Sequence, residues 1–131
     1  MSKISGPLLD RIDLHLEVPA VPFKELRTSG HAESSSEIRQ RVIRARQVQQ
    51  GRGYTNALMP SRTIPQYCAL DETGERTLEM AVRRLGLSAR AHDRILKVAR
   101  TIADLAGADR LAAKHVAEAV QYRSLDRSYW S

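Results

Sequence analysis

The sequence has few of the residues that mark disulfide-rich, metal-binding or membrane-spanning proteins. Its 131 residues include one cysteine and four histidines. A single thiol cannot form an internal disulfide, and the histidines show no metal-ligand spacing, so we interpret them as ordinary residues and expect no metal site. These histidines are His15, His31, His92 and His115. No apolar run of about 18 residues and no signal-peptide pattern is present, so we expect a cytoplasmic chain that makes no membrane contact.

The common catalytic motifs are also missing. The chain has no G-x-x-x-x-G-K-[ST] phosphate loop, no G-x-G-x-x-G and no locally spaced Ser/His/Asp set. By itself the chain is therefore not expected to be an enzyme.

What the sequence does contain is a core-forming share of apolar residues and an excess of positive charge. Hydrophobic residues make up 42% of the chain, and 21 Lys and Arg stand against 15 Asp and Glu, a formal charge of +6. A chain of this length is typical of one domain with a real core. The basic excess suggests an acidic partner, either nucleic acid or nucleotide phosphate, but it bears on association and not on fold.

The N-terminal part reads as a piece of something larger. Between Ile12 and Val18, apolar and polar residues alternate, which predicts a half-buried strand. No second strand is predicted elsewhere, so its partner would lie in another chain or in residues outside this sequence. Residues from Val21 to Ser35 have the composition of a linker. We therefore expect residues 1–35 to be a poorly ordered remnant of a larger core followed by a linker.

The remaining chain carries helix signals. Ser34 and Glu37 have the spacing of a capping box, and a helix is expected from there to about Gln50, ended by Gly51 and Gly53. Its apolar positions form a narrow stripe, and arginines spread around much of the remaining circumference. That stripe comprises Ile38, Val42, Ala45 and either Val48 or Gln49.

Further helices follow with short connections. After a helical turn around residues 65–68, one helix is expected from residue 71 or 73 to Leu85, with Gly86 as its C-terminal cap. Ser88 would cap the longest helix, which Gly107 ends, and the last helix would span residues 112–122. We predict an all-α fold, a small four-helix bundle over residues 36–125 with a tail at residues 126–131.

Two arginines are candidate phosphate ligands. Arg11 lies between an apolar turn and the predicted strand, where its planar, permanently charged guanidinium could reach a neighbouring phosphate. From spacing alone, a surface ion pair with Asp10 or Asp13 is the simpler interpretation. Arg90 falls in the first turn of the longest helix, where a cation opposes the helix dipole. Such a residue is either a tolerated surface cation or one that binds an anion.

The segment from Leu85 to Ser88 permits a different interpretation. A helix, a glycine-containing turn and a Ser-capped helix together are typical of a DNA-binding helix-turn-helix. Against this, the second helix has a long core-facing stripe that includes Ile95 and Ile102. A standalone DNA-binding domain is therefore the alternative function, and a helical adaptor that only docks a partner protein is a third.

Several stretches together resemble a known family. These are Ile4–Pro19, the helix from Ser36 ending Val-Gln-Gln-Gly-Arg, Leu87–Leu105 and Ala117–Arg123. They look like the C-terminal third of the magnesium-chelatase-like AAA+ ATPases of the ComM (YifB) competence type. The resemblance covers nearly the whole chain and is more specific than any single signal above.

The resemblance implies a function for the longer parent protein. Residues 1–35 would hold the last helix and strand of the AAA+ core, and residues 36–125 would be its helical lid. Arg11 matches the arginine finger that acts in trans on the neighbouring subunit, and Arg90 matches the sensor-2 arginine that contacts the ATP phosphates. The parent would be a hexameric ring that uses ATP and Mg²⁺ to drive DNA branch migration, as a helicase, in recombination and natural transformation. The isolated chain would be a monomer without a cofactor.

Overall fold

A computed structural model describes residues 12–16 and 32–123 of the chain. In these residues every regular element is helical, which confirms the predicted all-α class. The elements are the α-helices α3 (Ser35–Arg52), α4 (Ile64–Tyr67), α5 (Glu72–Leu85), α6 (Ala89–Leu105) and α7 (Ala113–Gln121), with the 3₁₀ turns η1 (Asn56–Leu58) and η2 (Ser61–Thr63). Most of the predicted N-terminal remnant and the predicted tail at residues 126–131 lie outside the described residues.

Local signals set the ends of the helices, as predicted. Ser34 Oγ accepts the backbone N–H of Glu37 at 3.2 Å, and the Glu37 carboxylate accepts the Ser34 N–H in return, so the capping box of α3 is present. Gly53 ends α3 in the left-handed region, at φ 101°. Between α5 and α6, the N–H of Leu87 donates to the Val82 carbonyl across Gly86, which is the Schellman arrangement.

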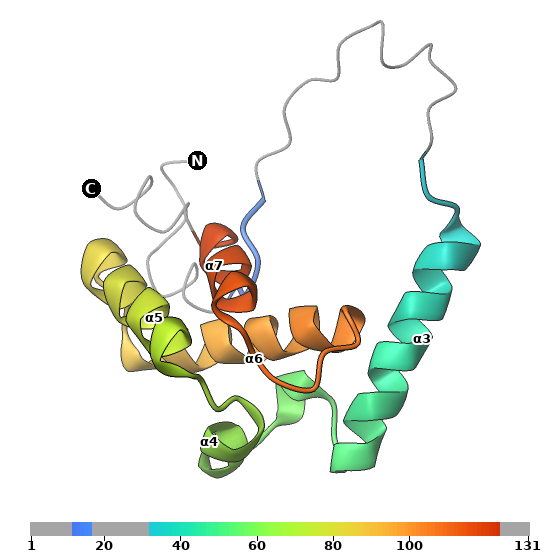
Figure 1. The fold of residues 1–131 in the computed structure, drawn as a ribbon, viewed down its shortest axis with the longest axis horizontal. Coiled ribbons are helices and arrows are strands. Elements are labelled where there is room, and N and C mark those ends of the chain that lie inside the picture. Colours follow the sequence, from blue (N-terminus) through green and yellow to red (C-terminus); the bar gives the residue numbers. More distant parts are fainter. Residues whose placement is uncertain (1–11, 17–31, 124–131) are drawn as a thin grey trace, which may run out of the picture.

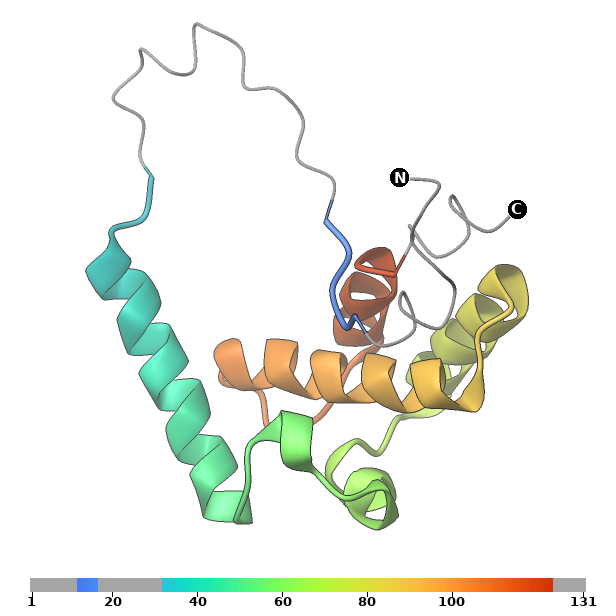
Figure 2. The ribbon, with the colours of Figure 1, turned by 180° about the vertical axis from the view of Figure 1, so that it is seen from behind.

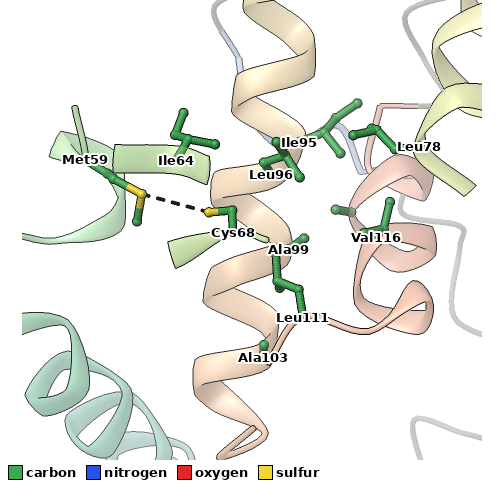
Figure 3. Close-up of a cluster of buried hydrophobic side chains, with 11 residues drawn as sticks. Met59, Ile64, Cys68, Leu78, Ile95, Leu96, Ala99, Ala103, Leu111 and Val116 are labelled. Carbon is green, nitrogen blue, oxygen red and sulfur yellow. Dashed lines mark hydrogen bonds between the residues drawn. The ribbon is translucent and has the colours of Figure 1, made fainter. Parts of the chain in front are cut away.

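The core is built around α6, which crosses the middle of the molecule (Figure 1). It contacts α3, α4, η1 and α7, while α5 packs against α7. Ala91, Ile95, Ala99 and Ala103 on α6 are at most 1% exposed, and Val116 and Leu78 approach them from α7 and α5 (Figure 3). Small residues on α6 let the neighbouring elements come close, and this explains how a chain with few aromatics closes a core.

Cys68 lies within this core. Its sulfur is 3.9 Å from that of Met59 (Figure 3), and the residue is 3% exposed. Burial raises the pKa of its thiol to about 11. A buried thiol with so high a pKa is a poor nucleophile, so Cys68 is a packing residue.

The predicted apolar stripe of α3 is only partly buried. Ala45 and Gln49 are buried, but Ile38 and Val42 are 43% and 44% exposed and Val48 is 48% exposed. The reason is visible in Figures 1 and 2, where α3 approaches the other helices through its C-terminal part while its N-terminal part extends beyond them. The stripe is therefore buried only in its C-terminal part.

The half-buried strand predicted at Ile12–Val18 is not formed in its described part. Residues 12–16 form no strand, and Ile12, Leu14 and Leu16 are exposed while His15 is buried. Apolar side chains on alternate positions are buried only if a sheet covers them, and the described residues contain no sheet. The segment lies beside α7 (Figure 1), where the N–H of His15 donates to the Tyr122 carbonyl at 2.6 Å and Arg123 donates to the Ile12 carbonyl.

A buried polar cluster, which the sequence analysis did not predict, joins α3 to α6. The Asp104 carboxylate accepts two hydrogen bonds from Arg52, at 2.7 and 2.9 Å, and one each from Asn56 and Arg100. Arg100 also donates to three backbone carbonyls, of Tyr67, Ala108 and Asp109. Arg100 and Asp104 are therefore two buried side chains of opposite charge at which five segments meet. These segments are α3, η1, α4, α6 itself and the loop before α7.

At the start of α7, His115 forms a cap that depends on its protonation. The N–H of Ala112 donates to His115 Nδ1 at 2.9 Å, so this nitrogen must be unprotonated. Burial, with the charges of Lys114 and Arg100, lowers the pKa of His115 below its ordinary value of 6.5. The unfolded chain therefore binds a proton more readily than the folded one.

The cap predicts a pH dependence of stability. The contribution of His115 is complete above about pH 6.5, and it is lost as the pH falls from there through the lowered native pKa. We expect His115→Gln to flatten the pH dependence of the free energy of unfolding in this range, which urea titrations at several pH values would measure. His92→Gln, which changes a half-exposed histidine, is the control. An unchanged pH profile in His115→Gln would contradict the role of the cap.

None of the described helices is both long enough and apolar enough to cross a membrane.

Candidate functional site

A groove of about 520 Å³ lies between the N-terminal half of α6, the turn η1 and residues 12–16. Its charged side chains are three cations and two carboxylates, which leaves a positive excess. The lining residues are Asp13, Leu14, Asn56, Ala57, Ser61, Arg90, Asp93, Arg94, Lys97, Val98 and Thr101.

The three cations, Arg90, Arg94 and Lys97, form a row along α6. Their spacing of four and then three residues places them on one face of the helix, over two turns and about 10 Å of its length. We call them the cation row. An α-helix with such a row offers a series of donors to a ligand that carries several linked negative groups.

Arg90 is at the N-terminal end of the row. It is the second residue of α6, next to the cap in which Ser88 Oγ accepts the N–H of Ala91 at 3.2 Å. Arg90 is exposed and faces the groove. The positive end of the helix dipole lies at the same place, and both favour an anion in the groove.

Arg94 and Lys97 are tied to the other walls. Arg94 forms an ion pair with Asp13, which lies 81 residues away in sequence. Lys97 Nζ donates to the Ala57 carbonyl of η1 at 3.4 Å. These two contacts connect residues 12–16 and η1 to α6 across the groove.

The two predicted site residues have different outcomes. Arg90 lines the groove, whereas Arg11 lies outside the described residues. Lys97 and Asp13 also line the groove, and neither was predicted from the sequence as a site residue. The basic spacing at residues 90, 94 and 97 is a signal that could have indicated the row, but no local pattern connects Asp13 to it.

The donor set of the groove fits phosphate. Guanidinium and ammonium groups pair with phosphate oxygens, and two arginines allow bidentate contacts. Among the described residues, no group of three or more His, Cys, Asp or Glu side chains could hold a metal ion. The cations of the groove can bind and orient phosphates.

The geometry of α6 is unfavourable for DNA major-groove recognition. Seven of its 17 residues are buried, and α3, α4, η1 and α7 all contact it. A recognition helix must present a free face to base edges. In this fold α6 is the central helix, and its exposed groove face is occupied in part by residues 12–16.

Comparison with known proteins gives one consistent family. The family model described as magnesium chelatase, subunit ChlI C-terminal, matches residues 32–123. The chain is 43% identical over 129 residues to the competence protein ComM of Haemophilus influenzae and 47% identical over 131 residues to the uncharacterized protein YifB of Salmonella typhimurium. It is 34% identical over 128 residues to the uncharacterized protein Rv2897c of Mycobacterium tuberculosis.

These matches cover 97%, 97% and 94% of the chain, but only 25%, 26% and 25% of the respective relatives. The chain thus spans about a quarter of the length of the proteins it resembles. The family model alone covers more than two-thirds of it, over the same residues that form the helical fold. The chain therefore belongs to the family of the magnesium chelatase subunit ChlI C-terminal domain, and it is similar to the ComM and YifB proteins.

Proposed function

We propose that the chain is the helical lid domain of a ComM-like AAA+ ATPase that couples ATP hydrolysis to DNA branch migration in recombination and natural transformation. The observation that carries the proposal is Arg90, which stands at the start of α6 in a groove with a positive excess. The family match and the similarity to a competence protein support it.

In this proposal the chain supplies two arginines to nucleotide sites. Arg90 is the sensor-2 residue, and its fork pairs with phosphate oxygens of ATP held by the same subunit. Arg11 is the arginine finger, which stabilises negative charge on the phosphoryl group at the neighbouring subunit. ATP with Mg²⁺ supplies the phosphoryl group, and the other residues that bind it belong to the remainder of a hexameric parent.

A second function, standalone sequence-specific DNA binding, is less well supported because α6 is the core helix. A titration of the chain with duplex DNA at several salt concentrations distinguishes the two. The lid function predicts weak binding without sequence preference, whereas nanomolar and sequence-selective binding would favour the DNA-binding domain.

The role of Arg90 predicts an effect on phosphate binding. Inorganic triphosphate should bind the chain weakly at low salt and shift the NMR signals of residues around the groove. Arg90→Ala should weaken this binding about tenfold, since a charge-assisted hydrogen bond contributes about 1.5 kcal/mol. Arg83→Ala, on the exposed face of α5 in an i,i+4 pair with Glu79, is the matched control. Equal binding by the Arg90 and Arg83 variants would refute the assignment.

A further inference from the structure

The helix α3 carries positive charge that the fold does not neutralise. Arg39, Arg44 and Arg46 are exposed, and within the part of the chain that the structure describes none of them forms an ion pair. Two exposed arginines of α5 differ, because Arg76 and Arg83 each pair with a glutamate four residues earlier, at 2.6 and 2.7 Å. The three arginines of α3 are therefore available to a negatively charged partner.

These arginines border the side of α3 that faces away from the core. The core side is marked by the buried residues Ala45 and Gln49. At 3.6 residues per turn, the opposite side of the helix carries four exposed residues, which we call the outer face. The outer face consists of Ser36, Gln40, Ile43 and Gln47.

The outer face has a basic edge on each side. Arg39 and Arg46 are seven residues apart, which is almost two turns, so they lie on one edge and about 10 Å apart along the helix. Arg44 lies on the other edge, about 140° around the helix axis from Arg39. The helix thus presents a mainly polar strip between two lines of positive charge.

This arrangement matches the major groove of duplex DNA in shape and in charge. The groove is about 12 Å wide and admits an α-helix, and a phosphate backbone runs along each of its sides. The N-terminal part of α3 extends beyond the other helices (Figures 1 and 2), so that a duplex can approach it. A single strand is a poorer fit, because α3 has no aromatic side chain on which bases could stack.

Building on the proposed function, we infer that α3 lies in the major groove of duplex DNA, with Arg39 and Arg46 on the phosphates of one strand and Arg44 on those of the other. The complementary charges supply the affinity, and phosphate contacts carry no sequence information, so binding is tolerant of sequence. Unlike α6, α3 has the free face that such docking needs. The lid would contact the DNA directly through this helix.

The test is a titration of a labelled duplex of 20 or so base pairs and mixed sequence with the 131-residue chain, followed by fluorescence anisotropy at several salt concentrations. Replacing Arg39, Arg44 and Arg46 together by Gln should weaken binding at least tenfold at low salt. It should also reduce the slope of log K against log salt by about 2–3, since each lost phosphate contact accounts for about 0.9. Glutamine is a good helix former, so α3 is expected to persist, which circular dichroism checks.

A matched triple variant removes the same charge from other surfaces. It carries Arg76→Gln and Arg83→Gln on α5 and Arg110→Gln in the loop before α7, all at exposed positions. Its affinity should change less than about twofold, because these residues lie away from the outer face. Equal affinities and salt slopes of the two triple variants would overturn the inference.

A single substitution tests the position of the duplex on the helix. Gln47→Glu places a negative charge in the middle of the outer face and should weaken binding about fivefold, since it would face the phosphates. Gln66→Glu makes the same change at an exposed position of α4 and is the control. Equal effects of the two would overturn the docking on the outer face. Tighter binding of a single strand, or equally effective competition by polyglutamate, would overturn the assignment to duplex DNA.

The DNA test and the test of Arg90 fail independently. None of the α3 residues named above lines the groove that contains Arg90. If the α3 variants leave DNA binding unchanged, the inference about α3 fails, while the effect of Arg90→Ala on triphosphate binding still tests the proposed function. If triphosphate binding is instead insensitive to Arg90, the salt slopes of the α3 variants still decide whether this helix binds DNA.

Discussion

Asp104→Ala is expected to lower the free energy of unfolding by about 3–5 kcal/mol, because it leaves cations buried without their partner. The Asp104 side chain is fully buried, and that of Arg100 is 3% exposed. Arg52, at 13%, is nearly as well shielded. Without the carboxylate, Arg100 keeps only its backbone carbonyls, and its charge is uncompensated in the core.

The pKa of Asp104 is consistent with this role. Burial by itself would raise it, but the hydrogen bonds from Arg52 and Asn56 and the charge of Arg100 outweigh burial and lower the pKa below its ordinary value of 3.8. A lowered native pKa means that the carboxylate stabilises the fold above pH 3.8 and that this contribution is lost as the pH falls through the native value. The cluster is thus complete at neutral pH.

Urea unfolding followed by circular dichroism measures the expected loss. Asp104→Asn, which keeps the shape and some hydrogen bonds, shows how much of the effect is due to charge. Glu79→Ala removes the carboxylate of an exposed i,i+4 pair and should cost less than about 0.5 kcal/mol. A loss below about 1 kcal/mol in Asp104→Ala would mean that the cluster contributes little, as buried ion pairs sometimes do.

The elements that sequence reasoning predicted correctly are those determined by neighbouring residues. Ser34 with Glu37, Ser88 and Gly86 act on backbone groups within a few positions, and the ends of α3, α5 and α6 lie close to where these residues predict them. The same holds for Gly107, which follows α6 in the left-handed region at φ 72°. Cap chemistry is local, so one sequence is enough to read it.

The features that were missed depend on contacts between distant residues. Arg52 and Asp104 are 52 positions apart, and Asp13 and Arg94 are 81 apart. On the sequence, Arg100 and Asp104 look like ordinary charged residues of an amphipathic helix, although they lie among its buried positions. Their burial is possible only because α3, η1 and the loop before α7 bring donors and acceptors to them, which no periodicity encodes.

The largest functional effect is expected for Arg11, on the proposal that it acts in trans. A suitable host is Haemophilus influenzae ComM in which the matching quarter is replaced by this chain, with which it is 43% identical. In that chimera Arg11→Ala should reduce ATP hydrolysis about a thousandfold or more, since an arginine finger is worth roughly 10³–10⁵ in rate. Arg83→Ala, on the exposed face of α5, should leave the rate unchanged and serves as the control.

Mixing two inactive chimeras separates action in trans from action within one subunit. One carries Arg11→Ala with an intact phosphate loop, and the other carries intact Arg11 with its phosphate-loop lysine replaced. If Arg11 serves the neighbouring site, randomly mixed rings place an intact loop beside an intact Arg11 at roughly a quarter of the interfaces, and hydrolysis returns. If Arg11 serves its own subunit, each site takes its phosphate-loop lysine and its Arg11 from the same chain. Each chain in the mixture has lost one of these two residues, so no activity returns.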